Sequence, residues 1–272
     1  MQVNFLLGVA VSSLVAFSGY KKGALSGDGF WGALFVGAAI ITFGGWLWFI
    51  LLLAFFISSS ILTRLKKKEK WKVYQKFDKG GERDFIQTLA NGGLGAILAI
   101  CNSFFTGPLW FGAYVGAMAT VNADTWATEL GVLSRKTPRL ITSGSRVPPG
   151  TSGGITRAGF MASVSASLLI GFVALIGLFA KTATWQTHLW IALAALVSGT
   201  LGSLLDSFLG ATKQAMFYCP RCGEETEGRV HSCGERTRMI RGSTWLNNDG
   251  VNLISSLFGA VLGALGAYFW AG

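Results

Sequence analysis

Two carboxylates stand five residues apart inside an apolar stretch of the chain. Residues 121–134 read VNADTWATELGVLS, with Asp124 and Glu129 but no Lys or Arg between them. A carboxylate at membrane depth costs roughly 2.5 to 3.5 kcal/mol on insertion scales, so it normally faces a partner or a water-filled cavity. Such acids are suitable ligands for Mg²⁺. On an ideal helix the two side chains diverge by about 140°, so sharing one ion would require a break in the helix.

Further polar residues occupy the corresponding ends of other apolar stretches. Asp206 ends one stretch, Asp249 begins another, and Asn91 lies just inside a third. The sequence NND before the last stretch is also a good helix N-cap, which is the structural alternative for Asp249. We expect these residues to converge on one level, with four candidate Mg²⁺ ligands: Asp124, Glu129, Asp206 and Asp249.

A glycine-rich basic segment follows the first two acids. Residues 134–159 read SRKTPRLITSGSRVPPGTSGGITRAG and lead into the next apolar stretch. Consecutive glycines let backbone N–H groups close on an anion, and a helix N-terminus behind them adds a positive dipole end. The P-loop pattern is absent, and a simple Pro/Gly-rich connector is the alternative. We expect donor phosphates to bind at Arg146, Gly150, Thr151, Ser152, Gly153 and Gly154.

Basic residues near other membrane boundaries are candidates for a second phosphate, that of an acceptor. The most basic run, residues 64–84, is mainly typical of a solvated linker that touches anionic lipid. At its end we expect Arg83 to bind the acceptor phosphate, with Lys213 and Arg241 as alternatives. Acids that hold a divalent cation, together with groups that hold phosphates, indicate phosphoryl transfer. No histidine lies among the acids, which favours metal ligation over base catalysis.

Three cysteines and a histidine are close in sequence in CPRCGEETEGRVHSC. Cys219 and Cys222 have C-x2-C spacing, and Cys233 follows beside His231. Thiols in a cytoplasmic loop stay reduced, and this spacing is more often a zinc knuckle than a disulfide. We expect a structural Zn²⁺ site formed by all four residues. A water as fourth ligand, or an empty site, is the alternative, because His231 and Cys233 are separated by one residue.

Composition assigns these residues to a membrane protein. Of the 272 residues, 51% are hydrophobic and 13% charged, whereas a soluble domain carries roughly 25% charged residues. In a soluble protein, a net charge of +10 would suggest a nucleic-acid partner. Here the basic residues lie in the loops between apolar segments, so we expect no nucleic-acid partner. Segments that approach membrane-spanning length are 4–20, 30–43, 45–62, 85–101, 109–130, 156–180, 188–210 and 250–271.

The predicted fold is all-α, a polytopic transmembrane helical bundle of about eight helices. It forms a single integral membrane domain over 1–272, with a small cytoplasmic Cys/His loop inserted at 215–245. Gly44-Gly45 marks a tight turn between two helices or a kink in one, and the charge distribution favours the turn. All of the 23 basic residues except Lys181 then lie on one side, which the positive-inside rule makes cytoplasmic, with both termini opposite. The first segment lacks a basic n-region and a cleavage site, so we expect a retained helix.

Five blocks of sequence match a known family, in order. The chain resembles the integral membrane family that contains plant phytyl-phosphate kinase. The matching blocks are ERDFIQTLANGG (82–93), NADTWATELGVLS (122–134), PPGTSGGIT (148–156), LGSLLDSFLGATKQ (201–214) and LNNDGVNLISS (246–256). The Cys/His insertion is not universal in that family, which suggests an accessory role for it.

The plant member phosphorylates phytyl phosphate to phytyl diphosphate for tocopherol synthesis. The resemblance therefore implies a membrane kinase for phytyl or polyprenyl monophosphate, with Mg²⁺ and a nucleoside triphosphate donor such as CTP. The family's motif residues correspond here to Asn91, Asp124, Glu129, Gly150, Thr151, Gly153, Gly154, Asp206, Asn248, Asp249 and Asn252. We expect Asn91, Asn248 and Asn252 to orient ligands, since the last two are one turn apart on one helix face.

Two other functions fit parts of the pattern. A transporter of lipid phosphates or cations would place charges near the bilayer midplane in paired halves, whereas these acids gather at one edge. A CTP-dependent lipid nucleotidyltransferase shares the Mg²⁺ and CTP chemistry but releases pyrophosphate. The expected partners are a prenyl monophosphate lipid, a nucleoside triphosphate and membrane lipids. Prenyl chain length and oligomeric state, a homo-oligomer included, stay open.

Overall fold

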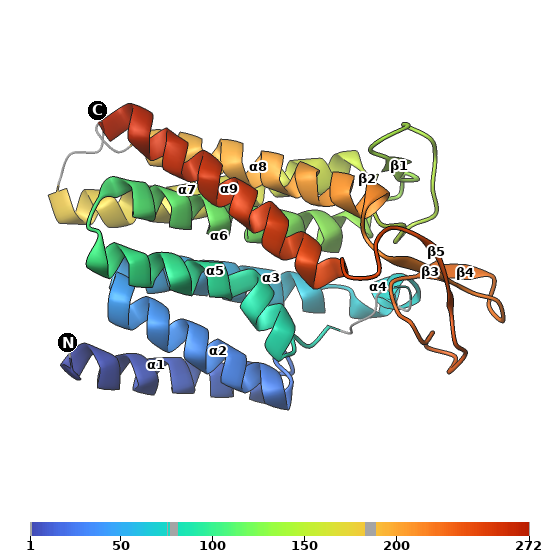
Figure 1. The fold of residues 1–272 in the computed structure, drawn as a ribbon, viewed down its shortest axis with the longest axis horizontal. Helices are drawn as coiled ribbons and strands as arrows, with labels where there is room; N and C mark the ends of the chain where they lie inside the picture. Colours follow the sequence, from blue (N-terminus) through green and yellow to red (C-terminus); the bar gives the residue numbers. More distant parts are fainter. Residues whose placement is uncertain (1, 75, 77–80, 183–188, 272) are drawn as a thin grey trace.

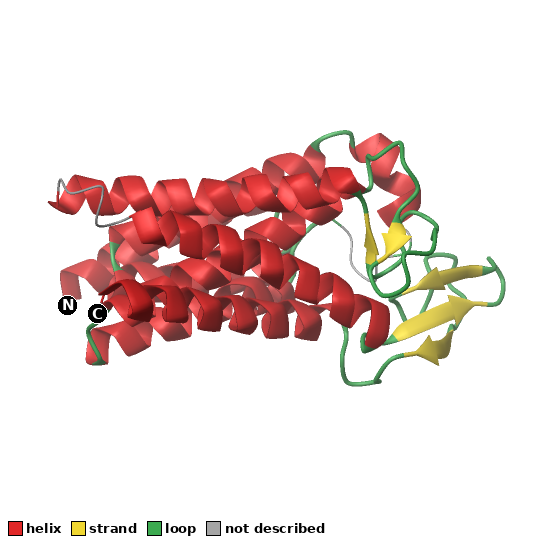
Figure 2. Ribbon diagram, turned by 90° about the horizontal axis from the view of Figure 1, so that it is seen from above, coloured by secondary structure: helices red, strands yellow, loops and turns green. Residues whose placement is uncertain are grey.

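The helices run side by side along the molecule, and the strands gather at one end (Figures 1 and 2). The first helix begins and the last helix ends at the opposite end. A computed structural model of the chain describes residues 2–74, 76, 81–182 and 189–271. Outside these lie the first residue of the expected span 188–210, and residues 75 and 77–80 of the basic run 64–84.

The described helices follow one another with short connections. In chain order they are α1 (Gln2–Lys21), α2 (Gly27–Ala39), the π-helix η1 (Ile40–Gly44), α3 (Trp46–Arg64), α4 (Lys67–Tyr74), α5 (Phe85–Phe104), α6 (Pro108–Gly131), α7 (Arg157–Thr182), α8 (Leu189–Thr212) and α9 (Asn248–Ala271). Together they confirm the predicted all-α polytopic bundle.

Six described helical segments are long and apolar enough to cross a membrane. They are α2 continued by η1, α3, α5, α7, α8 and α9. The expected span 4–20 forms α1, whose apolar part is shorter, and the expected span 109–130 forms α6. Both are helical as predicted but fall outside the six. For α6 the reason lies in its polar residues, Asn122, Asp124 and Glu129 among them.

The turn at Gly44-Gly45 separates two helices, as the charge distribution predicts. Gly45 has φ of +82°, and α3 begins at the next residue. Backbone at this φ favours glycine because a Cβ would be strained. A Cβ at Gly44 would lie only 2.7 Å from the ring of Trp48, so this position also needs a residue without a side chain. The kink in one long helix is therefore excluded.

Helix α6 is the centre of the bundle and packs against α3, α5, α7, α8 and α9. Its residues from Gly112 to Ala123 are buried without interruption. Asn122 Nδ2 donates a hydrogen bond to Ala166 O on α7 at 3.0 Å, and Asn122 Oδ1 accepts one from Ser58 on α3 at 3.1 Å. Buried polar side chains that are satisfied in this way link helices inside a membrane.

Glycines allow α6 and α9 to touch backbone to backbone. Gly112 and Gly116 on α6 face Gly259 and Gly263 on α9, so each helix has glycines four residues apart. A Cβ at Gly116 would lie 2.1 Å from Gly259 O, and one at Gly263 would lie 2.2 Å from Gly112 O. Small residues at this spacing drive close packing of membrane helices.

Two small antiparallel sheets lie at the strand end. The first pairs β1 (Arg139–Leu140) with β2 (Gly154–Ile155), in the register Arg139 to Ile155. The second has the order β4-β3-β5 and is formed by β3 (Met216–Cys219), β4 (Glu224–Thr226) and β5 (Arg238–Arg241). The segment expected as a Cys/His loop is therefore a three-stranded sheet, here named the Cys/His ribbon (residues 216–241).

Gly116→Ala should loosen the crossing of α6 and α9. The new Cβ would clash with Gly259 O, the helices would have to separate, and overpacking of this kind costs about 1–3 kcal/mol. Thermal unfolding in detergent should then occur at a lower temperature. Gly93→Ala is the matched control, because its Cβ would only make an ordinary contact with Leu89 at 3.8 Å. Equal unfolding temperatures for the two variants would contradict the close crossing.

Candidate active site

A cavity of about 280 Å³ lies where the helix ends meet the strands. Its wall is formed by the strand-side ends of α3, α5, α6, α7, α8 and α9 and by the loop that contains β1 and β2. Most of the residues predicted from the sequence line it. These are Arg83, Asn91, Asp124, Glu129, Gly150, Thr151, Ser152, Gly153, Gly154, Asp206, Asn248, Asp249 and Asn252.

Asp124 of α6 is paired with Asp206 of α8. The two carboxyl groups are within hydrogen-bonding contact, and Ser255 of α9 donates to Asp206 Oδ2 at 2.8 Å. Two carboxylates in contact repel each other unless a proton or a cation lies between them. The acidic partner of Asp124 is thus on another helix and is not Glu129. A break in α6, which would be needed for Asp124 and Glu129 to share one ion, is therefore not required.

The carboxylate of Glu129 is held by other side chains. Thr63 donates to Oε1 at 2.6 Å and Lys70 Nζ donates to Oε2 at 2.6 Å, while Lys70 also donates to Leu62 O. The side chain of Lys70 is fully buried and that of Glu129 is 9% exposed. The carboxylate of Glu129 thus binds α4 to α6 at the edge of the cavity, and its role as a metal ligand stays a prediction.

Lys70 shows that the basic run 64–84 is more than a solvated linker. Lys67 and Lys68 on the same helix are exposed, whereas Lys70 is 1% exposed. The sequence offers no periodic signal for this difference, because the partner of Lys70 lies 59 residues away. The buried ion pair docks α4 against the cavity wall.

The glycine-rich loop closes over the cavity. Gly150 and Gly153 have φ of +81° and +83°, and a Cβ at Gly153 would lie 2.4 Å from that of Ala211 at the end of α8. Two amides are used inside the loop, since Thr151 N donates to Pro148 O and Gly154 N donates to Thr151 O. Of the backbone N–H groups of residues 150–154 that we expect to bind phosphate, these two already donate to carbonyl oxygens within the loop.

Three basic residues predicted to bind phosphate do not line the cavity. Arg241 donates to the carbonyl oxygens of Gly210, Ala211 and Ser152, at 3.0, 2.6 and 3.3 Å. This guanidinium therefore fastens the glycine-rich loop to the C-terminal end of α8, where cations are favoured by the helix dipole.

Arg146 and Lys213 are exposed and lie outside the cavity wall. Long basic side chains on loops gain most of their hydration by pointing outward. The expected phosphate contacts of Arg146, Lys213 and Arg241 stay predictions, since these three residues lie outside the cavity wall, whereas Arg83 lines it.

Arg83 lies at the apolar edge of the cavity. Its guanidinium donates to Ser59 Oγ at 2.9 Å and Ser60 Oγ at 3.2 Å. It also lies 5.8 Å from the ring centroids of Phe55 and of Phe56. Contacts of this kind hold a planar guanidinium in a fixed orientation.

Two further polar residues of the cavity come from the segment that leads into the Cys/His ribbon and from the ribbon itself. Ser152 donates to Gln214 Oε1 at 3.0 Å, and Gln214 Nε2 donates to Glu227 Oε1 at 2.9 Å. Glu227 and Gln214 both line the cavity. Sequence reasoning missed them, because Glu227 lies in a polar stretch of the sequence, GEETEGR, with no apolar pattern to mark it.

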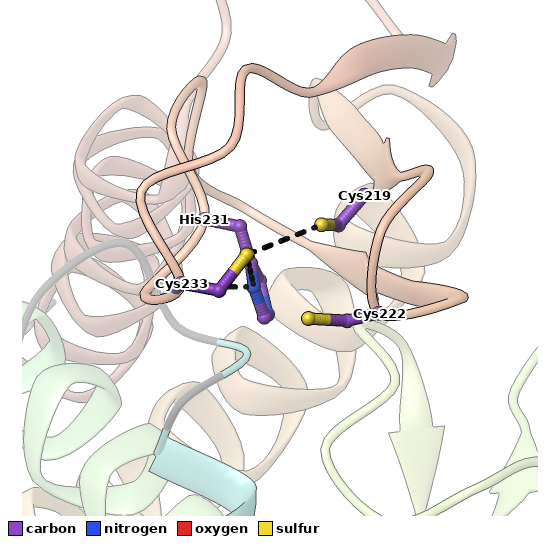
Figure 3. A group of neighbouring side chains, drawn as sticks. All are labelled: Cys219, Cys222, His231 and Cys233. Atoms are coloured by element: carbon purple, nitrogen blue, oxygen red, sulfur yellow. Dashed lines mark hydrogen bonds between the residues drawn. The ribbon is translucent and has the colours of Figure 1, made fainter.

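Four side chains of the ribbon gather into one cluster (Figure 3). Ligand atoms of Cys219, Cys222, His231 and Cys233 all lie within 4.8 Å of one another. The Sγ atoms of Cys219 and Cys233 are 3.7 Å apart, and two thiolates on a tetrahedral Zn²⁺ would be about 3.8 Å apart. His231 is buried, its Nδ1 lies 3.2 Å from Cys233 Sγ, and its Nε2 has no partner among the described residues. The donor set and its spacing fit zinc.

The thiols of the cluster differ in acidity. The hydrogen bond with His231 lowers the pKa of Cys233 to about 6. The hydrogen bond with Cys233 raises the pKa of Cys222 to about 11. Since the thiolate is the form that binds a metal, Cys233 is the thiol of this pair that is ready to do so at neutral pH.

The carboxylates of the cavity are arranged differently from this cluster. Among the described residues, the groups of three or more His, Cys, Asp or Glu side chains that could hold a metal ion include the Cys/His cluster but no group of cavity acids. Mg²⁺ is usually bound by one or two carboxylates together with substrate phosphates and water, rather than by a complete protein cage. An Asp124–Asp206 pair that faces a cavity fits this kind of site.

The bundle and its cavity define an integral membrane protein with a polar cavity at one end. The chain belongs to the family of integral membrane proteins called DUF92, whose profile matches residues 10–260. This confirms the resemblance found in the sequence.

Relatives match over most of the chain. Protein PGR of Arabidopsis thaliana is 35% identical over 98% of each chain. An uncharacterized membrane protein of Methanocaldococcus jannaschii is 29% identical over 97% of this chain and 94% of its own. Protein VTE6, chloroplastic, of Arabidopsis thaliana is 25% identical over 89% of this chain and 65% of its own. No solved structure matches the chain.

Lys70→Met should destabilise the protein strongly. It removes the cation from a buried pair, a change that costs about 3–5 kcal/mol. The unfolding temperature in detergent should fall, and Lys70→Met combined with Glu129→Gln should lose less than the two single variants added together. Glu69→Gln is the control, because it breaks the exposed Lys66–Glu69 pair and should cost less than about 1 kcal/mol. Additive single effects would refute the coupling.

Proposed function

We propose that this protein is a membrane-embedded prenyl-phosphate kinase. It transfers the terminal phosphoryl group of a nucleoside triphosphate, CTP in particular, to phytyl or polyprenyl monophosphate and forms the diphosphate. The observation that carries the proposal is the pair Asp124–Asp206 in a cavity whose apolar edge holds Arg83. A metal-binding acid pair and a fixed guanidinium are the two elements needed to hold a donor and an acceptor phosphate.

Family relationships support the same reaction class. The blocks that resemble the family of plant phytyl-phosphate kinase contain most of the residues that line the cavity, and the chain is also related to Protein VTE6, chloroplastic. The identity to that relative is 25%. The prenyl substrate and the CTP donor are therefore proposed from the resemblance, whereas the residues of the cavity support transfer between phosphates.

Asp124 and Asp206 would hold Mg²⁺, with Asp249 as a further ligand. Bound there, Mg²⁺ would neutralise charge on the donor phosphates and fix their geometry. Thr151 and Ser152 of the glycine-rich loop lie on the same cavity wall and would hydrogen-bond the donor. Asn91, Asn248 and Asn252 would orient the two phosphate chains through their side-chain amides.

The acceptor needs no general base. The second pKa of a phosphate monoester is about 6, so its oxygens are already deprotonated at neutral pH. One of these oxygens forms a bond to the terminal phosphorus of the donor while the bridging P–O bond of the donor breaks. The products are the prenyl diphosphate and the nucleoside diphosphate. Arg83 would hold the acceptor phosphate in line for this displacement.

The orientation in the membrane follows from charge. Basic residues gather in the loops at the strand end, so the positive-inside rule makes this end cytoplasmic and the termini external. A cytosolic nucleotide would then reach the cavity from water while the prenyl chain stays in the membrane. This division gives a physical reason for a kinase to be membrane-embedded.

Asp124→Asn and Asp206→Asn should each lower kinase activity by about 100-fold or more while the protein remains folded in detergent. The assay combines purified protein, Mg²⁺, labelled nucleoside triphosphates and prenyl monophosphates, and it resolves all products. Glu69→Gln, an exposed acid on α4, is the control and should keep wild-type activity.

Three results would overturn the assignment. The absence of prenyl diphosphate with every donor and chain length refutes the kinase. Release of pyrophosphate with a nucleotidyl lipid indicates a nucleotidyltransferase instead. Movement of lipid phosphate or cations across proteoliposomes without chemical change indicates a transporter.

For the Cys/His ribbon we propose a structural Zn²⁺. Cys219, Cys222, Cys233 and His231 would bind it, and the metal would keep the ribbon folded, as in other small sites with this ligand set. Lining residues Gln214 and Glu227 would thereby be held in place.

Protein purified without chelators should contain about one zinc per chain by elemental mass spectrometry. Cys219→Ser and His231→Ala should lower the zinc content and the unfolding temperature, because each removes a ligand. Cys101→Ser is the matched control, since Cys101 lies on α5 away from the cluster, and it should retain the metal. Wild-type protein without zinc, or with zinc that survives both ligand substitutions, would refute the site.

A further inference from the structure

An apolar groove opens beside the polar cavity. It has a volume of about 50 Å³ and lies between α1, α2, α3 and α5. Its lining is aliphatic, aromatic or glycine, except for Ser12, Arg83, Thr88 and Asn91. A concave apolar surface with few polar groups is suited to a hydrocarbon ligand.

The groove and the cavity meet at two residues, because Arg83 and Asn91 line both. At this junction the guanidinium of Arg83 lies against Phe55 and Phe56, whose rings belong to the wall of the groove. A single position therefore borders a polar space on one side and an apolar space on the other. This is the geometry required by an amphiphile whose charged head and hydrocarbon chain are directly joined.

The groove extends from this junction into the bundle. Along α3 its lining runs from Phe56 back to Phe49, a helical rise of roughly 10 Å. Across from α3, the short side chains of Ala16 and Ala33 leave space that larger residues would fill. A chain that begins at Arg83 would follow this path and then pass into the lipid.

The opposite side of α6 is closed to such a chain. There α6 and α9 meet at Gly112, Gly116, Gly259 and Gly263, with backbone atoms in contact. Helices that pack this closely leave no room for a ligand between them. This contrast favours the α1, α2, α3 and α5 side as the path of the hydrocarbon.

We propose that this groove binds the first isoprenoid units of the acceptor, a prenyl monophosphate whose phosphate lies at Arg83. The inference rests on the proposed kinase function and adds where the chain lies and which residues select its length. The isoprenoid units gain affinity by leaving water for an apolar wall, and Phe55 and Phe56 border the unit next to the phosphate.

Substitutions in the groove should change chain selectivity. Ala33→Leu narrows the groove and should raise KM about tenfold for farnesyl and geranylgeranyl monophosphate, whose later units extend along it. It should not do so for dimethylallyl monophosphate, whose single unit occupies only the part of the groove next to Arg83, beside Phe55 and Phe56. Leu53→Ala widens the groove and should shift the preference the opposite way, toward longer chains. Ala38→Leu, on the same helix but outside the lining, is the matched control and should leave the profile unchanged.

A binding measurement separates this inference from the reaction itself. Farnesyl monophosphate that carries a diazirine on its last isoprene unit is irradiated with the full-length protein in detergent, without nucleotide, and the labelled peptides are mapped. Labels should lie on α1, α2 and α3, and Ala33→Leu should reduce them severalfold relative to Ala38→Leu.

The two proposals fail in different ways. Labels confined to α7, α8 or α9, or a chain-length profile that no groove variant changes, overturn the groove while diphosphate formation can persist. Labels in the groove without any diphosphate product overturn the kinase and leave a prenyl-phosphate binding site.

Discussion

The arrangement depends on how closely α6 can approach its neighbours. Glycines at positions 112, 116, 259 and 263 remove the side chains that would otherwise keep α6 and α9 apart, and Asn122 satisfies its amide on α3 and α7. A helix that is enclosed on every side can carry acids at its end, because its neighbours supply partners in place of water. The contact of Asp124 with Asp206 is a direct consequence of this packing, since Asp206 belongs to α8, which packs against α6.

The cost of burying charge explains why the polar residues gather at one end. Ionisable groups inside a membrane need partners or water, and the strand end provides both through its loops. Glu129 is satisfied by Lys70 and Thr63, and Arg241 is satisfied by the carbonyl oxygens at the end of α8. These residues hold the walls of the cavity together. Asp124, in contact with Asp206, and Arg83, bonded to Ser59 and Ser60, also line the cavity.

Local sequence signals predicted most of the fold. Long apolar segments marked the helices, Gly44-Gly45 marked the turn before α3, and Cys spacing marked four residues that do lie together. What local patterns could not supply were partners distant in sequence. In the sequence, Lys70 cannot be distinguished from its exposed neighbours, because its ion-pair partner lies 59 residues away. Glu227 likewise has the sequence surroundings of a loop residue. The carbonyl groups that Arg241 binds carry no sequence signature.

The cavity joins two parts of the chain with different chemistry. Arg83, Asn91 and the apolar groove come from the first five helices, whereas the acid pair, the asparagines of α9 and the glycine-rich loop come from the later part. The Cys/His ribbon connects these two parts of the chain. Thr226 Oγ1 and Glu227 N both donate hydrogen bonds to Lys76 O, which follows α4. Glu227 also accepts a hydrogen bond from Gln214, which follows α8. A metal that orders the ribbon would thus set how closely the two parts approach. In a transfer between phosphates that approach is the main variable, since positioning and charge supply nearly all of the catalysis.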